Sequence, residues 1–157
     1  MKRKSVMLVV AAAALVLAAS AAAFRLDVIR GTAGPDTLNG TNGSDLIYAR
    51  GGNDIVHGHD GNDVVYAGRG NDVVRGGKGN DVLYGGPGDD VMWPGSGVDV
   101  QYGGEGNDVL HALANDNQVD TLDCGPGYDV VWLNAAEQDT QVNCEVVHMV
   151  STITPGG

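Results

Sequence analysis

Basic residues are scarce in this chain, and their scarcity limits the partners it can have. The chain carries 9 Lys and Arg against 20 Asp and Glu, which gives a formal net charge of -11 at pH 7. After the first 23 residues there is no basic patch and no amphipathic basic helix. An acidic surface of this kind repels nucleic acid and anionic lipid, whereas it suits cations. We therefore expect a cation, and no nucleic acid, as a partner.

Motifs of catalysis and nucleotide binding are also missing. The chain has no G-x-x-x-x-G-K-[ST] sequence, no H-E-x-x-H sequence and nothing that resembles a nucleophile elbow. His57 and His59 could suggest a transition-metal site. We interpret them instead as solvated surface residues, because His59 falls in an expected turn and His57 on an expected outer face. The sequence predicts a protein that is not an enzyme.

The amino-terminal segment has the composition of an export signal. Three basic residues at 2–4 precede an apolar run over 6–19 and three alanines at 21–23. This order is typical of a cleaved secretory signal peptide, which we assign to residues 1–23. An uncleaved membrane anchor is the alternative, although a bilayer span needs about 20 apolar residues. Cleavage would remove three positive charges and no negative ones, take the net charge from -11 to -14, and leave a secreted, extracellular protein.

The chain has two cysteines, Cys124 and Cys144. In an exported chain an even number of cysteines favours a disulfide. It would close a loop of about 20 residues and contribute about 3 kcal/mol to stability. Two free buried thiols are the alternative. A zinc site is disfavoured, because neither cysteine has a second one in C-x-x-C spacing.

Aspartate recurs at a strict interval of nine residues, and a glycine stands two positions before each copy. The aspartates are Asp36, Asp45, Asp54, Asp63, Asp72, Asp81, Asp90, Asp99 and Asp108. A strict period in a glycine-rich chain indicates one short structural unit stacked on copies of itself. Nine such units run from residue 31 to residue 111, and good copies are GGKGNDVLY at 76–84 and GGEGNDVLH at 103–111.

Each unit has six turn-forming residues followed by a triplet of β-formers such as Val64-Val65-Tyr66. A triplet is too short for an isolated strand, so it is expected to pair with the triplets above and below it. Side chains alternate along a strand, so the middle residue faces away from its neighbours. This middle row predicts the core, and it contains Leu38, Ile47, Val56, Val65, Val74, Leu83, Met92, Gln101 and Leu110.

The third residue of the triplet differs between odd and even units. The even units end in Tyr48, Tyr66, Tyr84 and Tyr102. We therefore expect 18 residues per coil, with odd triplets in one sheet and even triplets in a facing sheet. The tyrosines, together with the outward first residues of the triplets, would form an apolar outer strip. Such a strip indicates either a contact surface or only the strand propensity of β-branched side chains.

Stacking would place the aspartates in two rows, five on one edge of the rod and four on the other. Neighbouring carboxylates about 5 Å apart would repel by about 3 kcal/mol per pair at an effective dielectric constant of about 20. Over all neighbouring pairs this is comparable with the stability of a whole domain. A divalent cation in each gap between neighbouring carboxylates would replace this repulsion with attraction. Carboxylate and carbonyl oxygens are ligands that suit Ca²⁺. The gaps predict about seven calcium ions, and no carboxylate is left for glycosidase chemistry.

These units resemble the calcium-binding nonapeptide GGxGxDxUx of the RTX, or haemolysin-type, family. The resemblance covers residues 31–111, about half of the chain. It implies a parallel β-roll in which each Ca²⁺ lies between two loops and is bound by loop carbonyls and by the carboxylate at the sixth position. Carried over, the ligands are the nine aspartates, with backbone carbonyls near Gly52, Gly61, Gly70, Gly79 and Gly88. The expected fold is all-β, a two-sheet right-handed solenoid.

Some units depart from this pattern. The second glycine is replaced by Thr32, Thr41, Arg50 and His59 in the first four units. A loop that needs a positive φ there would be strained. The eighth unit has Val98 before its aspartate and Gln101 in the core row. We therefore expect the site between Asp81 and Asp99 to bind calcium weakly or not at all.

The period breaks after residue 111. Asp120 begins what looks like a unit with three inserted residues, and CGPGYDVVW at 124–132 looks like a further turn around Asp129. A stacked rod exposes an apolar end and needs a cap. We assign 112–150 to degenerate repeats and a cap.

The cap would be pinned by a Cys124–Cys144 disulfide and would include a strand at 146–150. Residues 24–30 form a lead-in to the repeats, and 151–157 form a loose tail.

Two functions are consistent with these features. The first is a secreted calcium-binding protein that folds when it is exported into calcium, because the unbound aspartates oppose folding. The alternative is a calcium-dependent, adhesin-like module that binds a glycan or a cell-surface protein through the tyrosine strip. Ice binding would need a regular Thr/Asn array, and Asn39 alone occupies an outer third position with such a residue.

Overall fold

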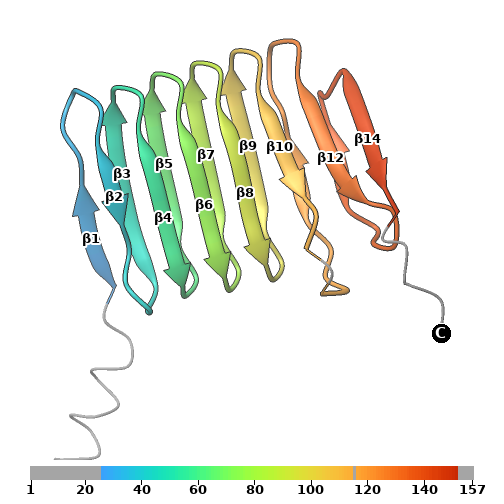
Figure 1. The fold of residues 1–157 in the computed structure, drawn as a ribbon, viewed down its shortest axis with the longest axis horizontal. Helices are drawn as coiled ribbons and strands as arrows, with labels where there is room; N and C mark the ends of the chain where they lie inside the picture. Colours follow the sequence, from blue (N-terminus) through green and yellow to red (C-terminus); the bar gives the residue numbers. More distant parts are fainter. Residues whose placement is uncertain (1–25, 115, 152–157) are drawn as a thin grey trace, which may run out of the picture.

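The computed structural model describes residues 26–114 and 116–151, which form a flattened β-solenoid (Figure 1). These residues contain fourteen strands and no helix. It follows that no described helix could cross a membrane. The predicted signal peptide and the tail beyond residue 151 lie outside the described residues, and the lead-in contributes the first strand.

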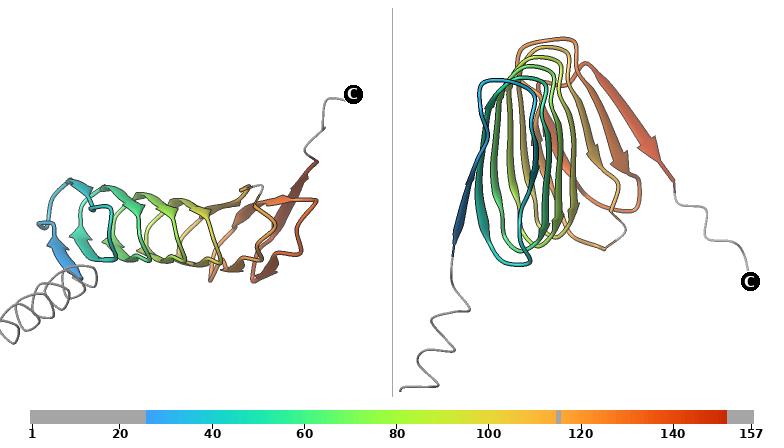
Figure 2. Two further views of the ribbon diagram at one scale, coloured as in Figure 1. Left: turned by 90° about the horizontal axis from the view of Figure 1, so that it is seen from below. Right: turned by 60° about the vertical axis from the view of Figure 1, so that its left-hand side comes forward.

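The strands alternate between two parallel sheets that face each other (Figure 2). Sheet 1 contains, in spatial order, β1 (Asp27–Arg30), β3 (Asp45–Gly51), β5 (Val64–Arg69), β7 (Val82–Pro87), β9 (Val100–Glu105), β11 (Thr121–Asp123) and β13 (Thr140–Val142). Sheet 2 contains β2 (Thr37–Asn39), β4 (Ile55–Asp60), β6 (Val73–Lys78), β8 (Val91–Ser96), β10 (Val109–Ala112), β12 (Val130–Asn134) and β14 (Val146–Val150). The predicted all-β, two-sheet solenoid is confirmed.

The register of the strands follows the 18-residue period. Val64 on β5 pairs with Val82 on β7. Beyond the repeats the offset grows, and Val100 on β9 pairs with Thr121 on β11. The three additional residues are accommodated between the strands, so the sheet continues without a break. Asp120 therefore starts a further coil, as the sequence predicts.

The strands are longer than the predicted triplets. In β5 the triplet is followed by Ala67, Gly68 and Arg69, which continue the strand to six residues. The prediction that such residues belong to the turn is wrong, because pairing with equivalent segments in the neighbouring coils holds them extended. The alternation of faces then turns Ala67 inward, where it is fully buried.

The core is a column of small and aliphatic side chains between the sheets. The predicted middle row supplies Ile47, Val56, Val65, Val74, Leu83, Met92 and Leu110, all with 0% exposure. A second inward row, absent from the prediction, contains Ala49, Ala67, Ala112, Cys124 and Leu133. Gln101 is also buried, and its Nε2 donates to the carbonyl oxygen of His111 at 2.8 Å.

Positive φ angles recur where the coils approach each other closely. Gly79 has a φ of 125°, and a Cβ there would overlap the carbonyl oxygen of Gly61 in the preceding coil. Arg50 and His59 adopt φ angles of 84° and 83°, so the strain expected for them is present. Positive φ is not found at the two threonines, and the strain expected there is wrong.

The carboxy-terminal section is made of further coils. β11 and β13 extend sheet 1, while β12 and β14 extend sheet 2, including the predicted strand at 146–150 (Figure 1). The predicted Cys124–Cys144 disulfide is present, with the two Cα atoms 5.3 Å apart. It joins the residue after β11 to the segment before β14. Met149 on the terminal strand is 57% exposed.

Candidate metal centre

The loops at the two edges of the solenoid bring the nine predicted aspartates into two rows. The first row lies where the chain passes from sheet 1 to sheet 2 and contains Asp36, Asp54, Asp72, Asp90 and Asp108. The second row lies on the opposite edge and contains Asp45, Asp63, Asp81 and Asp99. Each aspartate stands directly before, or at the start of, a strand, so the regular register of the sheets fixes the spacing of each row.

Each carboxylate is held by the coil before it. The backbone N–H of Asp45 donates to Oδ1 of Asp63, and the N–H of Asp63 donates to Oδ1 of Asp81, both at 2.8 Å. The same bond recurs along both rows. Apart from Asp36, the repeat aspartates are at most 1% exposed. The fold therefore carries two columns of buried, oriented carboxylates.

The second oxygen of most of these carboxylates has no hydrogen-bond partner among the described residues. Buried Oδ2 atoms of this kind belong to Asp54, Asp63, Asp72, Asp81, Asp90, Asp99, Asp108, Asp129 and Asp139. Burying a charged oxygen without a compensating partner is strongly unfavourable. Each of these Oδ2 atoms therefore needs a proton or a bound cation to offset its negative charge.

A glycine leaves space beside these oxygens. At Gly58, the position that a Cβ would occupy overlaps both Oδ2 of Asp63 and the carbonyl oxygen of Gly76 in the next coil. Gly85 is placed in the same way against Asp90. A carboxylate oxygen and a carbonyl oxygen thus face one space. These are hard oxygen ligands of the kind that Ca²⁺ takes, usually six to eight of them. The donor set fits calcium.

The carbonyls predicted as ligands lie at the contacts between coils. A Cβ at Gly88 would overlap the carbonyl oxygen of Gly70, and one at Gly70 that of Gly52. The carbonyl oxygens of Gly61 and Gly79 face the next coil in the same way. A carbonyl that faces the next coil is placed where an ion between two loops could reach it. That these carbonyls bind the ion stays a prediction.

Burial raises the pKa of the carboxyls along the rows. The pKa of Asp63 and Asp72 rises to about 6, that of Asp81 to about 7 and that of Asp90 to about 8. The main cause is desolvation. The hydrogen bond from the preceding coil opposes the shift, and the carboxylates of neighbouring coils add to it. Without a cation, the fold therefore disfavours the charged form of these groups.

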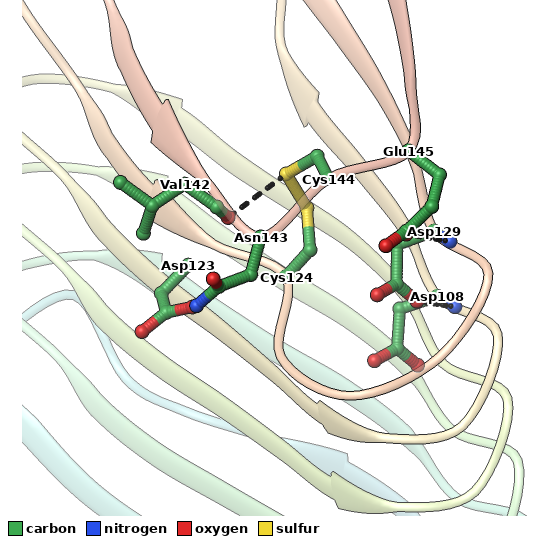
Figure 3. Close-up of a disulfide and its surroundings, with 8 residues drawn as sticks. All are labelled: Asp108, Asp123, Cys124, Asp129, Val142, Asn143, Cys144 and Glu145. Carbon is green, nitrogen blue, oxygen red and sulfur yellow. Dashed lines mark hydrogen bonds between the residues drawn. A yellow bond between two sulfur atoms is a disulfide. The ribbon is translucent and has the colours of Figure 1, made fainter.

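Both rows continue beyond residue 108. In the first row, Asp108 N–H donates to Oδ1 of Asp129, and Asp129 N–H donates to Oε2 of Glu145, both at 2.8 Å (Figure 3). In the second row, Asp120 and Asp139 follow Asp99. Asp120 and Asp129 were expected in degenerate units, whereas Asp139 and Glu145 were not expected in the rows, because their units lack the glycines. The sequence signal that could have identified them is an acidic residue shortly before a strand.

Thr32 and Thr41 close the two rows at the amino-terminal end, because each bonds the first repeat aspartate of its row. The N–H and Oγ1 of Thr41 donate to Oδ2 of Asp45 at 2.6 and 3.1 Å. Thr32 bonds Oδ2 of Asp36 in the same way, at 2.5 and 2.9 Å. These threonines therefore bond the same oxygen, Oδ2, that has no hydrogen-bond partner among the described residues in the later repeat aspartates of the rows.

A ladder of amide side chains runs beside the carboxylates in the opposite direction. Oδ1 of Asn62 accepts from the N–H of Asn80 in the next coil at 2.9 Å, and Oδ1 of Asn80 accepts from the N–H of Val98 at 3.0 Å. Val98 cannot continue this ladder. The carboxylate row is nevertheless intact there, because Asp81 N–H donates to Oδ1 of Asp99 at 2.7 Å. Weak calcium binding at this gap stays a prediction.

Aromatic side chains form a ladder on the outer face of sheet 1. The ring centroids of Tyr48, Tyr66, Tyr84 and Tyr102 are 5.1, 4.7 and 4.8 Å apart in succession, with planes within 7° of parallel. The ring faces are therefore used in stacking with one another, and the ladder presents ring edges to solvent. This arrangement stabilises the stacked coils.

Histidines contribute to a second stack on sheet 2. Trp93, His111, Trp132 and His148 stack in succession there. The rings of His57 and His59 are 6.1 Å apart. In the part of the chain that the structure describes, no group of three or more His, Cys, Asp or Glu side chains could hold a metal ion. A metal ion held at the aspartate rows would therefore need backbone carbonyls in addition to carboxylates.

Comparison with known proteins agrees with this arrangement. A family model for the RTX calcium-binding nonapeptide repeat, four copies long, matches residues 30–65, 39–74, 66–101 and 95–123. Together these matches span 30–123, which is more than half of the chain. No curated protein matches the chain. The matched span contains every aspartate of both rows from Asp36 to Asp120.

Proposed function

We propose that this chain, which belongs to the RTX calcium-binding nonapeptide repeat family, is an exported protein whose β-roll folds when Ca²⁺ binds between successive loops. Calcium binding itself is the property of the family. Export and the coupling of folding to binding are the new elements. The role that we infer is structural and non-catalytic.

The observation that supports coupled folding is the set of buried Oδ2 atoms that lack a donor among the described residues. A metal-free chain at neutral pH would have to bury these carboxylates either charged, against their neighbours, or protonated, against their ordinary pKa. Bound calcium removes both the cost of burying charged carboxylates and the cost of protonating them. Because the unfolded chain has no preformed site, the binding free energy contributes directly to folding.

The number of ions follows from the gaps between neighbouring repeat aspartates. The first row has four such gaps and the second has three, which gives about seven ions. The gaps beyond residue 108 lie outside the strict nine-residue repeats, so we leave them out of this number.

Export would bring the chain into contact with extracellular calcium. The composition of residues 1–23 supports a cleaved signal. Extracellular calcium modules bind at about 0.1–1 mM, so a chain of this type would remain unfolded until it leaves the cell. The protein recovered outside the cell should begin near Phe24. Protein found only inside the cell with residues 1–23 intact would contradict export.

Circular dichroism and calorimetry of the mature chain, residues 24–157, test the folding proposal. In chelator the spectrum should be that of an unfolded chain, and addition of Ca²⁺ should produce a β spectrum. Mg²⁺ at the same concentration should not replace Ca²⁺. Calorimetric titration should count about seven ions. A β spectrum that chelator leaves unchanged would show that folding does not depend on calcium.

A calcium-dependent, adhesin-like role remains the second candidate. What supports it is the exposed tyrosine ladder, in which Tyr66 is 38% and Tyr102 39% exposed. The partner would be a glycan or a cell-surface protein. Because the ladder also stabilises the coils, Tyr66→Phe with Tyr84→Phe is the better test, since it keeps the stacking and removes the hydroxyl groups. Binding on a glycan array or in a pull-down that survives this change would count against recognition by the tyrosine hydroxyls.

A further inference from the structure

A hollow of about 350 Å³ opens near the amino-terminal end of the solenoid, beside the first row of loops. Its lining consists of Thr32, Ala33, Arg50, Gly51, Gly52 and Arg69. The two arginines come from the ends of neighbouring strands, β3 and β5, and Arg69 pairs in register with Gly51. Both arginines are exposed. Adjacent coils thus bring two guanidinium groups to one concave surface, which we call the arginine hollow.

The arginine hollow is free of acidic residues although the chain is strongly acidic. None of the 20 Asp and Glu of the sequence lines it. The other basic side chains of the described residues have partners: Arg30 lies over Tyr48, Arg75 lies over Trp93, and Lys78 pairs with Asp60. Within the described residues, Arg50 and Arg69 form no ion pair. Two guanidinium groups without an ion-pair partner that line one hollow gain from a shared anion.

Arg50 also adopts a strained backbone conformation. Its φ is 84°, and the next coils have glycine at the equivalent position, with φ of 113° at Gly68 and 114° at Gly86. Glycine would satisfy this position without strain, so the backbone gains nothing from arginine here. A non-glycine residue held at positive φ is often associated with function.

We propose that the arginine hollow binds an oxyanion group, a carboxylate or a sulfate, either as a free ion or as part of a larger acidic ligand. A guanidinium group presents paired N–H donors that match two oxygens of such a group, and two of them converging on one anion give charge-assisted bonds. Calcium bound in the adjacent row would lower the negative potential that otherwise repels an anion. This site shares Gly52 with the predicted calcium ligands, but it differs from the calcium sites because it uses no carboxylate of the protein.

Titration of the folded mature protein tests the proposal. Sodium sulfate and sodium galacturonate are added separately at constant ionic strength, with enough calcium to keep the protein folded but too little to precipitate calcium sulfate. The side-chain Nε–Hε signals of Arg50 and Arg69 are followed by NMR. We expect saturable shifts with at least one of the two anions. Sulfate alone would indicate a free inorganic anion, whereas galacturonate would indicate the carboxylate of an acidic sugar.

Substitutions separate binding from folding. Arg50→Gly removes one guanidinium group and relieves the strain, so it should fold at least as well and bind at least about tenfold more weakly. Arg69→Gln should also weaken binding about tenfold. Arg75→Gln, on the outer face of sheet 2, is the matched control and should leave binding unchanged. Absence of saturable shifts in the wild-type protein, or equal binding by Arg50→Gly, would overturn the proposal, and circular dichroism in the same buffer separates this outcome from a failure to fold.

Discussion

The backbone N–H of Asp63 donates to Oδ1 of Asp81 at 2.8 Å, while Oδ2 of Asp81 is buried with no donor among the described residues. The two oxygens of one carboxylate thus have different roles. Oδ1 holds neighbouring coils in register, and Oδ2 faces the space where a cation would lie. Because the same arrangement recurs along both rows, the stability of each coil depends on the charge state of the next one.

Asp81→Asn separates these two roles. Asparagine can still accept the hydrogen bond from Asp63 but carries no charge, so the positional bond remains and the calcium ligand is weakened. We expect calorimetry to lose about one calcium ion, and the free energy of unfolding in calcium to fall by about 2 kcal/mol. In chelator the variant should be less destabilised than the wild-type protein, because one repulsive charge is gone.

Asp60→Asn is the matched control. Asp60 is exposed, lies outside both rows and pairs only with Lys78, at 3.1 Å. An exposed ion pair of this kind contributes about 0–1 kcal/mol. If Asp60→Asn reduced calcium binding as much as Asp81→Asn does, the effect would come from general surface charge and not from the rows.

The raised pKa values predict opposite effects of pH with and without calcium. The pKa of Asp81 is about 7 and that of Asp90 about 8 in the metal-free fold, against about 3.9 in an unfolded chain. A group whose pKa is raised by folding makes the folded state bind more protons than the unfolded state. Its contribution to stability is full below the unfolded pKa and is lost as pH rises through the folded pKa. The metal-free fold should therefore lose stability between about pH 4 and pH 8.

Calcium binding should show the reverse trend, because the ion competes with protons for the same oxygens. We expect the β signal in chelator to be stronger at pH 5 than at pH 8, and the calcium needed for half-maximal folding to fall as pH rises. Circular dichroism across this range, with chelator and with calcium, measures both. A metal-free β signal that grows with pH would contradict the buried-carboxylate explanation.

The nine-residue period, together with the alternation of the third triplet residue between odd and even units, was enough to predict the two sheets and the two rows. Since the coil length is constant, the position of Asp63 determines those of Asp45 and Asp81 in space. The inward position of Ala67 could not be predicted in the same way. It depends on whether a Gly-rich segment stays extended, and only pairing with neighbouring coils decides that.

The residues at the ends of the aspartate rows were harder to predict from the sequence, and the reason is physical. Thr41 appeared as a departure from glycine that would be strained, yet it bonds the carboxylate of Asp45. Its hydroxyl bonds Oδ2 of Asp45, the oxygen that has no partner within the described chain in the later repeat aspartates of the row, and periodicity cannot reveal this bond. Glu145 was missed because it performs the role of an aspartate with a longer side chain and without glycine before it.

Thr41→Val tests the closing of the second row. Valine keeps the shape and the backbone N–H bond but removes the hydroxyl bonds to Asp45 and to the backbone of Gly43. We expect the free energy of unfolding in calcium to fall by about 1 kcal/mol, and amide hydrogen exchange to accelerate near Asp45. Thr37→Val, on the exposed face of β2, makes the same chemical change outside the row and should leave both measurements unchanged. Equal effects of the two substitutions would show that the hydroxyl of Thr41 has no closing role.

The disulfide should matter most for the last coils. Cys124 and Cys144 close a loop of 20 residues, and replacing both with alanine should lower the free energy of unfolding by about 3 kcal/mol. The loss should be local, because each coil contacts only its neighbours and β14 is the terminal strand of sheet 2. Hydrogen exchange should therefore accelerate in β12 and β14 while β5 and β6 remain protected. Reduction of the wild-type protein should reproduce this pattern. Uniform acceleration along the rod would mean that the coils unfold as one cooperative unit, and that the disulfide stabilises all of them.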